Sequence, residues 1–363
     1  IETIEENGLT QYLEDLGEEL RKRTYRPQAV KRVWTEKPGG GQRPLGIPTI
    51  RDRIAQTACK LVLEPNYEAD FCEESYGYRP KRSAQEAIRR IKAHLQKGRT
   101  QVYDADLSQF FDSIPHDKLE IALRERVSDT RVLELIKLWL KAPVAEDDGQ
   151  YTSGKKRKKG TPQGGDISPL LANIFLHYVL DEWFVKEVQP RMRGRCFLLR
   201  YADDFIIGFE TADDARRVME VLPKRFARFG LTVHPEKTKL VRFGRPPGGG
   251  TLKDNGTVDF LGFTYFWAES RKGKWIIKKK TRGVRVNRFV KSIWQWCRTN
   301  RHEPLEEQYK ELCLKLRGHY QYYAVNHNSQ ALNDVWHHCR YAWHYWLSKR
   351  CSKGLVIWDN FEK

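Results

Sequence analysis

The sequence predicts an α+β fold built around an antiparallel sheet and followed by a separate helical part. Three observations lead to this class. Two apolar runs rich in β-forming residues, 197–201 and 205–209, flank a pair of acids, which is typical of a hairpin. Other predicted strands alternate irregularly with amphipathic helices. Composition changes near the C-terminal end, where residues 271–363 hold 20 Lys and Arg against 7 Asp and Glu.

The overall composition points to a folded protein with a polyanionic partner. The chain has 363 residues, 40% of them hydrophobic, and a formal net charge of +18. No apolar run approaches 18 residues and no signal peptide is evident, so we expect no membrane partner. The seven Cys are scattered without a C-x-x-C pair, which argues against a disulfide framework or a zinc site. A reducing cytoplasm is the expected location.

The N-terminal part is predicted to hold a helix and a glycine-rich hairpin. Apolar residues recur at helical steps within residues 1–30, and we expect a natural N-terminal portion to precede residue 1. Residues 33–48 form two strand-like arms around a Gly-rich turn. Lys37 and Arg43 stand on opposite arms, where both could reach one triphosphate. The alternative is a surface turn with two solvated cations.

The next predicted elements are a helix over 51–70 that ends near Pro65, a loop at 75–80, and a second helix. A capping box formed by Ser83 and Glu86 marks the start of that second helix. The basic residues just before it are Arg79, Lys81 and Arg82. They could bind phosphate ahead of the helix N-terminus, and a solvated basic loop is the alternative.

A second acid-bearing strand is predicted at residues 101–112, where alternation puts Asp104 and Asp106 on one face. Helices follow through Leu123 and from Arg131 to Leu140. The basic run at 155–159 is either a solvated loop or a nucleic-acid contact.

The stretch 160–169 is predicted to be a tight turn that delivers a helix, with Ser168 as N-cap and Pro169 as the first helical residue. Gly164 and Gly165 would let the backbone approach a flat ligand closely.

The acidic tip Asp203-Asp204 is the most informative feature of the sequence. Adjacent carboxylates between apolar strands repel each other, and a divalent metal would relieve that repulsion. The alternative is an ordinary Asp-rich turn. Asp106 supplies a third acid, and nucleotidyl transfer needs such oxygen ligands around two divalent ions. A helix over 213–229, closed by Gly230, and a basic helical bundle rich in Trp and Tyr complete the expected elements.

Eight motifs in a fixed order resemble one family. They are RPLGIP at 43–48, SYGYRP at 75–80, DLSQFFD at 106–112, TPQGGDISPLLANIFL at 161–176, RYADD at 200–204, HPEKT at 234–238, FLGF at 260–263 and LRGHYQYY at 316–323. In these motifs the chain resembles the reverse transcriptases encoded by group II introns, which often also act as maturases.

The resemblance implies a right-hand polymerase with fingers, an antiparallel palm and an α-helical thumb, called domain X. The implied boundaries are 1–100 for the fingers, with the N-terminal extension trimmed, and 101–270 for the palm. A fingers segment is inserted around 130–165, and the thumb spans 285–363.

The resemblance also implies roles for individual residues. The implied metal triad is Asp106, Asp203 and Asp204, which would hold two Mg²⁺ ions, with Mn²⁺ as an alternative. Within it, Asp106 and Asp203 would bridge the ions, and Asp204 would support the ion at the primer hydroxyl. The implied substrate contacts are Lys37 and Arg43 on the triphosphate, Gln163 in the nucleotide pocket, Lys237 near the pyrophosphate, and Phe111 under the sugar. A phenyl ring at position 111 excludes a 2′-hydroxyl, whereas viral RNA-dependent RNA polymerases typically carry an Asp there.

The expected function is therefore that of an RNA-directed DNA polymerase. Its partners would be an RNA template with a DNA or RNA primer, dNTPs and group II intron RNA, with roles in intron splicing and mobility. Two alternatives stay open: a reverse transcriptase attached to a CRISPR or phage-defence system, and a protein that serves mainly as an RNA-binding splicing cofactor.

Overall fold

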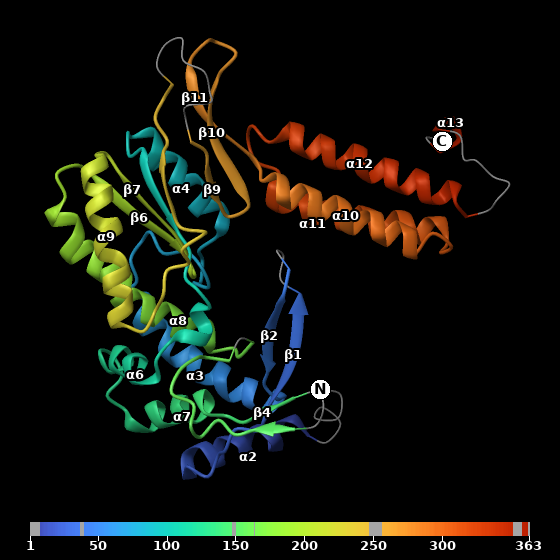
Figure 1. The fold of residues 1–363 in the computed structure, drawn as a ribbon. Helices are drawn as coiled ribbons and strands as arrows, with labels where there is room; N and C mark the ends of the chain where they lie inside the picture. Colours follow the sequence, from blue (N-terminus) through green and yellow to red (C-terminus); the bar gives the residue numbers. More distant parts are fainter. Residues whose placement is uncertain are drawn as a thin grey trace. The chain divides into compact units, whose positions relative to one another are not determined.

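The computed structural model describes residues 8–36, 40–146, 150–162, 164–246, 256–350 and 358–361 (Figure 1). Contacts divide the chain into two compact units. The first comprises Ile1–Ala87 and Tyr103–Leu240, and the second comprises Ile88–Val102 and Val241–Lys363. The boundaries of these units differ from those predicted for the fingers, palm and thumb. The fingers, palm and thumb boundaries stay a prediction. Within the described ranges, no helix is both long and apolar enough to cross a membrane.

The first unit opens with helix α2 (Leu9–Lys22) and the predicted hairpin. Strands β1 (Val30–Glu36) and β2 (Gln42–Ile47) pair antiparallel, with Thr35 opposite Arg43. The short strands β4 (Val144–Ala145) and β5 (Tyr151–Thr152) extend this sheet in the order β2-β1-β4-β5.

Helix α3 (Ile50–Glu68) corrects one sequence-based expectation, because it runs through Pro65 instead of ending there. A proline inside a helix removes the hydrogen bond of its own nitrogen, and its ring crowds the carbonyl four residues earlier, so tertiary contacts must hold the helix together there. The turn that follows is held by Tyr67, which is fully buried and donates its hydroxyl to the Leu123 carbonyl at 2.7 Å. The packing of one aromatic side chain thus offsets the missing backbone bond.

Helix α4 (Ala84–Gln96) begins as its capping box predicts. The Ser83 N–H donates to Glu86 at 2.9 Å, and the Glu86 N–H donates to Ser83 Oγ at 3.2 Å.

The sheet that carries the acidic hairpin has the strand order β6-β7-β3-β8. Its strands are β3 (Gln101–Ala105), β6 (Cys196–Tyr201), β7 (Asp204–Phe209) and β8 (Lys239–Arg242). Strands β6 and β7 are almost wholly buried, which explains their continuous apolar runs. Helix α9 (Ala212–Arg228) runs along this hairpin (Figure 1) and packs Phe226 against Phe205 with ring centroids 5.9 Å apart.

The other helices of the first unit are α5 (Phe110–Ser113), α6 (His116–Arg124), α7 (Thr130–Leu140) and α8 (Ser168–Leu176). Helix α8 begins at Ser168 itself, one residue earlier than expected, and Ser168 Oγ donates to the Pro162 carbonyl instead of capping the helix. Two π-helical segments then follow, η1 (His177–Asp181) and η2 (Phe184–Val188), and a short 3₁₀ turn, η3 (Gln189–Arg191). The sequence pattern did not predict these segments.

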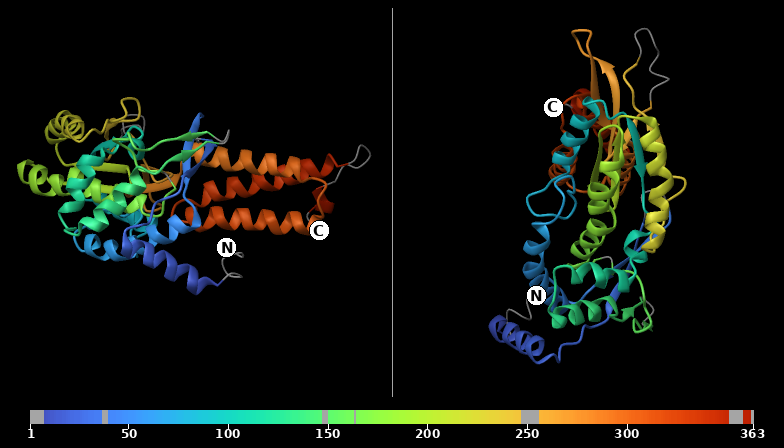
Figure 2. Two further views of the ribbon diagram at one scale, coloured as in Figure 1. Left: turned by 90° about the horizontal axis from the view of Figure 1, so that it is seen from below. Right: turned by 90° about the vertical axis from the view of Figure 1, so that its left-hand side faces the viewer.

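The second unit holds a three-stranded antiparallel sheet and a helical bundle. The sheet has the order β11-β10-β9 and consists of β9 (Val258–Phe260), β10 (Phe263–Glu269) and β11 (Trp275–Thr281). Figure 2 shows α10 (Gly283–Thr299), α11 (Leu305–Tyr323) and α12 (Ser329–Ser348) side by side; α13 (Trp358–Phe361) follows. The bundle packs around Ile293, Leu312 and Val335, with Trp and Tyr side chains partly buried against them.

Two of the sequence motifs meet inside this unit. In the FLGF turn, a Cβ added at Gly262 would lie 2.8 Å from the Tyr323 hydroxyl, and the Tyr322 hydroxyl donates to the Leu261 carbonyl at 3.0 Å. Both tyrosines belong to the LRGHYQYY motif of α11.

Candidate functional site

The predicted hairpin is present, but its turn begins one residue before the expected acidic tip Asp203-Asp204. Tyr201 pairs with Asp204, so that Ala202 and Asp203 alone form the turn. Ala202 has a φ of 57°, in the left-handed region that costs a residue with a Cβ about 1 kcal/mol or more. Asp203 is half-buried and Asp204 is exposed. A strained backbone at such a tip has to be held by its surroundings.

Asp106 stands just after β3 and is fixed by a segment far away in the sequence. Its carbonyl accepts a hydrogen bond from the His234 N–H at 2.8 Å, and its Oδ2 lies 2.9 Å from the Lys237 ammonium. Lys237 therefore neutralises Asp106 in this structure. The predicted contact of Lys237 with a pyrophosphate stays a prediction.

Electrostatics link Asp203 to two other predicted site residues. Burial raises the pKa of the Asp203 carboxyl above its usual value, and repulsion by Asp106 raises it further. The Asp203 backbone N–H and the guanidinium groups of Arg43 and Arg200 act in the opposite direction. Asp106, Asp203 and Arg43 thus form one charged neighbourhood, and Arg43 supplies it with an exposed cation from β2.

Two carboxylates in this neighbourhood, those of Asp106 and Asp203, could bind a metal ion. Among the residues that the structure describes, no group of three or more Asp, Glu, His or Cys side chains is arranged to hold a metal ion. Asp106 and Asp203 nevertheless offer the carboxylate oxygens that Mg²⁺ prefers, and a cation would relieve their mutual repulsion. The donor chemistry of this pair fits a divalent ion.

Phe111 lies beside the TPQGG segment, as the nucleotide-pocket hypothesis requires. Its carbonyl accepts from the Thr161 N–H at 2.8 Å, and the Gly160 N–H donates to the Ile114 carbonyl at 2.8 Å. The Phe111 ring is half-buried and contacts Phe110 edge to face at 5.4 Å.

The two glycines of that segment are required by close neighbours within the protein, and their close approach to a flat ligand stays a prediction. Gly164 has a φ of 115°, and a Cβ there would lie 2.5 Å from the Gly46 carbonyl oxygen in β2. A Cβ at Gly165 would lie 2.9 Å from Gln56 Oε1. The close neighbours are therefore parts of the protein itself, and the turn packs tightly against β2 and α3.

Two predicted substrate contacts, Lys37 and Gln163, lie outside the described residues.

A residue that the sequence reasoning missed, Tyr78, faces the same charged neighbourhood. Its side chain is 57% exposed and its φ is 57°. The pKa of Tyr78 is raised by partial desolvation of its hydroxyl and then by Asp203, Tyr201 and Asp204, and is lowered by Arg43. The sequence signal was available in part, because Gly77 and Pro80 mark the loop that presents this ring.

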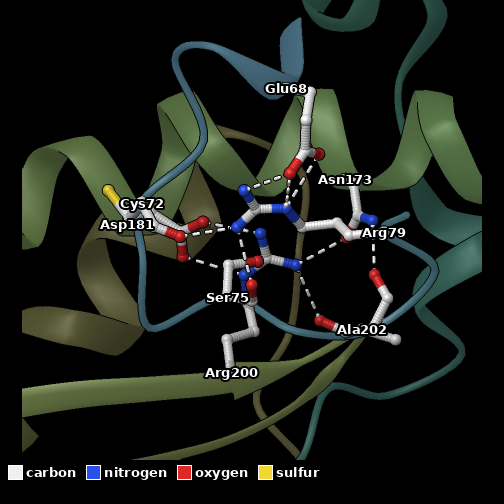
Figure 3. Close-up of polar contacts among 9 residues, drawn as sticks. Glu68, Cys72, Ser75, Arg79, Asn173, Asp181, Arg200 and Ala202 are labelled. Carbon is white, nitrogen blue, oxygen red and sulfur yellow. Dashed lines mark hydrogen bonds and ion pairs between the residues drawn. The ribbon is translucent and has the colours of Figure 1, made fainter. Parts of the chain in front are cut away.

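Arg79, the next residue along that loop, was expected to bind phosphate or to be solvated. The structure contradicts both expectations, because its side chain is only 2% exposed. It forms an ion pair with Glu68 at 2.6 Å and donates to the Cys72 and Ser75 carbonyls, both at 2.6 Å. Its hydrogen-bonding groups are used to fix the loop (Figure 3).

Both the sequence and the fold are similar to those of known proteins. A family model described as reverse transcriptase (RNA-dependent DNA polymerase) matches residues 35–265. Protein YkfC of Escherichia coli is 38% identical over 224 residues, covering 54% of this chain and 58% of that protein. The group II intron-encoded protein LtrA of Lactococcus lactis is 41% identical over 159 residues, covering 44% of this chain and 26% of that protein.

A more distant relative and a solved structure extend this picture. The nuclear intron maturase 2 of Arabidopsis thaliana is 34% identical over 180 residues, covering 40% of this chain and 24% of that protein. The chain spans less than two thirds of the length of each of these three relatives. A telomerase from Candida albicans matches 90% of this chain and 62% of its own chain, with a TM-score of 0.53 and 14% identity. That likeness shows the fold, and the predicted α+β class is confirmed.

Proposed function

Because the chain belongs to the reverse transcriptase family, we propose that it is an RNA-directed DNA polymerase, which adds dNTPs to a primer 3′-hydroxyl on an RNA template. The observation that carries this proposal is the meeting of Asp106, Asp203 and Arg43 within the matched region. Two carboxylates beside an exposed cation suit phosphoryl transfer, which depends on positioning and on neutralised charge.

The roles of the chain's own residues follow from their chemistry. Asp106 and Asp203 would hold the divalent metal that this family uses, with two Mg²⁺ ions and a contribution from Asp204 as the finer proposal. Bound there, Mg²⁺ would activate the 3′-hydroxyl and neutralise the triphosphate. Arg43 would bind triphosphate oxygens from its exposed position on β2. Lys237 forms an ion pair with Asp106 and balances its charge.

An intron-related role is proposed from the relatives. One is named as a group II intron-encoded protein and another as an intron maturase, which supports binding of intron RNA by this chain as well. Two basic features favour an RNA partner: the run at 155–159, where four Lys side chains are exposed, and the Lys- and Arg-rich second unit. A backbone hydrogen bond connects this basic run to α6, since the His116 N–H donates to the Lys158 carbonyl at 2.9 Å.

A primer-extension assay tests the proposed activity directly. We expect extension of a primer on an RNA template with dNTPs and Mg²⁺, and much weaker extension with rNTPs. Wild-type protein that binds primed RNA but extends nothing with either metal, Mg²⁺ or Mn²⁺, would contradict the polymerase and leave the RNA-binding cofactor.

Replacing Phe111 by Ala is expected to reduce the preference for dNTPs over rNTPs by at least about tenfold, because the phenyl ring fills the space that a 2′-hydroxyl would need. The ratio of kcat/KM for the two nucleotides measures this effect. Phe111→Tyr keeps the ring and serves as the matched variant, with discrimination close to that of wild type. Undiminished discrimination in Phe111→Ala would show that another group excludes the 2′-hydroxyl.

Replacing Tyr78 by Ala is expected to weaken the affinity for primed RNA by about tenfold. An exposed ring beside the acidic turn can stack on a base, and such stacking contributes about 1–3 kcal/mol. Fluorescence anisotropy with labelled primer–template measures the affinity. Tyr78→Phe keeps the stacking surface and should stay within about threefold of wild type. Equal losses in both variants would instead assign the effect to the hydroxyl.

A further inference from the structure

Arg200, the residue before the YADD turn, is a buried cation whose three side-chain nitrogens each donate a hydrogen bond to the protein (Figure 3). Its side chain is 1% exposed, and it forms a two-pronged ion pair with Asp181 at the end of η1. The distances are 2.8 Å from Nε to Oδ1 and 2.6 Å from Nη2 to Oδ2. The third nitrogen, Nη1, donates to Asn173 Oδ1 at 2.8 Å and to the Ala202 carbonyl at 3.0 Å.

The bond to the Ala202 carbonyl acts on the peptide group that leads directly into Asp203. Ala202 holds a left-handed φ of 57°, which its Cβ disfavours. In the absence of a restraint, this peptide would tend to rotate and carry the Asp203 carboxylate with it. Arg200 supplies the restraint, and the ion pair with Asp181 fixes the guanidinium plane that delivers it.

Asn173 of α8 extends the same network to the loop that presents Tyr78. Its side-chain amide donates to the Gly77 carbonyl at 2.7 Å while its oxygen accepts from Arg200. The Tyr76 N–H donates to the Arg200 carbonyl at 2.9 Å. A Cβ added at Gly77 would lie 2.3 Å from the Ala202 nitrogen, so the loop touches the turn itself.

We propose that Arg200 is a positioning residue, which acts with Asp181 and Asn173 to hold the Ala202–Asp203 peptide so that the Asp203 carboxylate stays where it can bind a divalent cation. This inference rests on the proposed polymerase function. A purely stabilising role is the alternative, but a buried ion pair adds little net stability over apolar side chains and is better suited to specifying one arrangement.

Arg79 provides a matched control for that alternative. It is as buried as Arg200 and also forms an ion pair, but its hydrogen bonds go to Glu68, Cys72 and Ser75 instead of the turn. Arg200→Lys keeps the charge opposite Asp181 but cannot reach all three partners with a single ammonium group. Arg79→Lys makes the same chemical change in the same part of the unit.

The test compares these two variants with wild type by two measurements. The first is the affinity for Mn²⁺ of the protein bound to primed RNA, with a primer that ends in a dideoxynucleotide and cannot be extended. The electron paramagnetic resonance signal of free Mn²⁺ measures this affinity. The second is the Mg²⁺ concentration that gives half-maximal primer extension. We expect Arg200→Lys to weaken Mn²⁺ binding and to raise the Mg²⁺ requirement by about tenfold each. Arg79→Lys loosens the loop but leaves every Arg200 hydrogen bond to the turn in place. Both values should therefore change by about threefold at most, clearly less than in Arg200→Lys, even if the two variants lose the same amount of thermal stability.

A second variant keeps the proposal testable if Arg200→Lys does not fold. Asn173→Ala leaves the ion pair intact but removes the link to Arg200 and Gly77, and a threefold to tenfold loss of Mn²⁺ affinity is expected. Equal Mn²⁺ affinities in wild type, Arg79→Lys and the Arg200 and Asn173 variants would overturn the positioning role. Wild-type protein that binds Mn²⁺ but extends no primer would instead overturn the proposed function, and the Mn²⁺ comparison would still decide the role of Arg200.

Discussion

Replacing Asp203 by Asn is expected to lower the rate of primer extension by about 10³-fold or more, as when a group that stabilises developing charge is lost. Asn has almost the same shape but carries no negative charge, so it cannot balance a divalent cation. Asp203 sits half-buried beside Asp106; burial raises the pKa of its carboxyl, and repulsion by Asp106 raises it further. Removing that repulsion should leave the free energy of unfolding equal to or above that of wild type. The variant should therefore be inactive and well folded.

Single-turnover primer extension measures the loss of rate, and thermal unfolding measures the stability of the variant. Asp213→Asn is the matched control, because Asp213 is exposed on α9 and pairs with Arg216. It should extend primers as wild type does. Primed-RNA binding by Asp203→Asn should also stay within about threefold of wild type. Extension above about a tenth of the wild-type rate in Asp203→Asn would refute the assigned role.

Replacing Gly77 by Ala should cause the second large effect, on stability and rate together. The added Cβ would meet the Ala202 nitrogen at 2.3 Å and the Tyr201 carbonyl carbon at 2.9 Å. Both are backbone atoms in a turn that is held on all sides, so the turn or the loop has to shift. Overpacking of this kind costs about 1–3 kcal/mol. A displacement of about 1 Å at a catalytic group can lower the rate about 10²-fold.

Gly318→Ala is the control for this substitution. Gly318 lies inside α11, and nothing stands within 4 Å of its added Cβ. Ala there should raise the free energy of unfolding by about 0.5–1 kcal/mol. Urea denaturation and primer extension of both variants give the comparison. A Gly77→Ala protein with wild-type stability and rate would mean that the loop yields without disturbing the turn.

The local features of the fold were accessible from the sequence because short-range chemistry decides them. The capping box of Ser83 and Glu86 formed as expected, and the acidic hairpin followed from the apolar runs on either side, although its turn begins at Ala202. The helix expected from Arg131 is capped by Asp129, whose carboxylate accepts from the Arg131 N–H at 2.8 Å. In each case the partners are within a few residues of one another.

The features that could not be predicted depend on partners distant in the sequence. Arg79 follows a tyrosine and precedes a proline, which is typical of an exposed loop, yet Glu68 and the Ser75 carbonyl bury its charge. Lys237 meets Asp106 across 131 positions of sequence. Gly164 is required by the backbone of β2, which no local pattern reveals.

The strand order β6-β7-β3-β8 has a consequence for synthesis on the ribosome. Strand β3 lies between β7 and β8, yet it leaves the ribosome about 100 residues before β7 and still longer before β8. Chain synthesis proceeds at roughly 5–20 residues per second, so both edges of β3 stay unpaired for about 5–20 s before its first partner strand emerges. During that interval the nascent chain exposes an unpaired strand next to Asp106, and unpaired edges invite association with other chains. The sheet that carries the acidic hairpin is thus completed only after most of its chain segments have been synthesised.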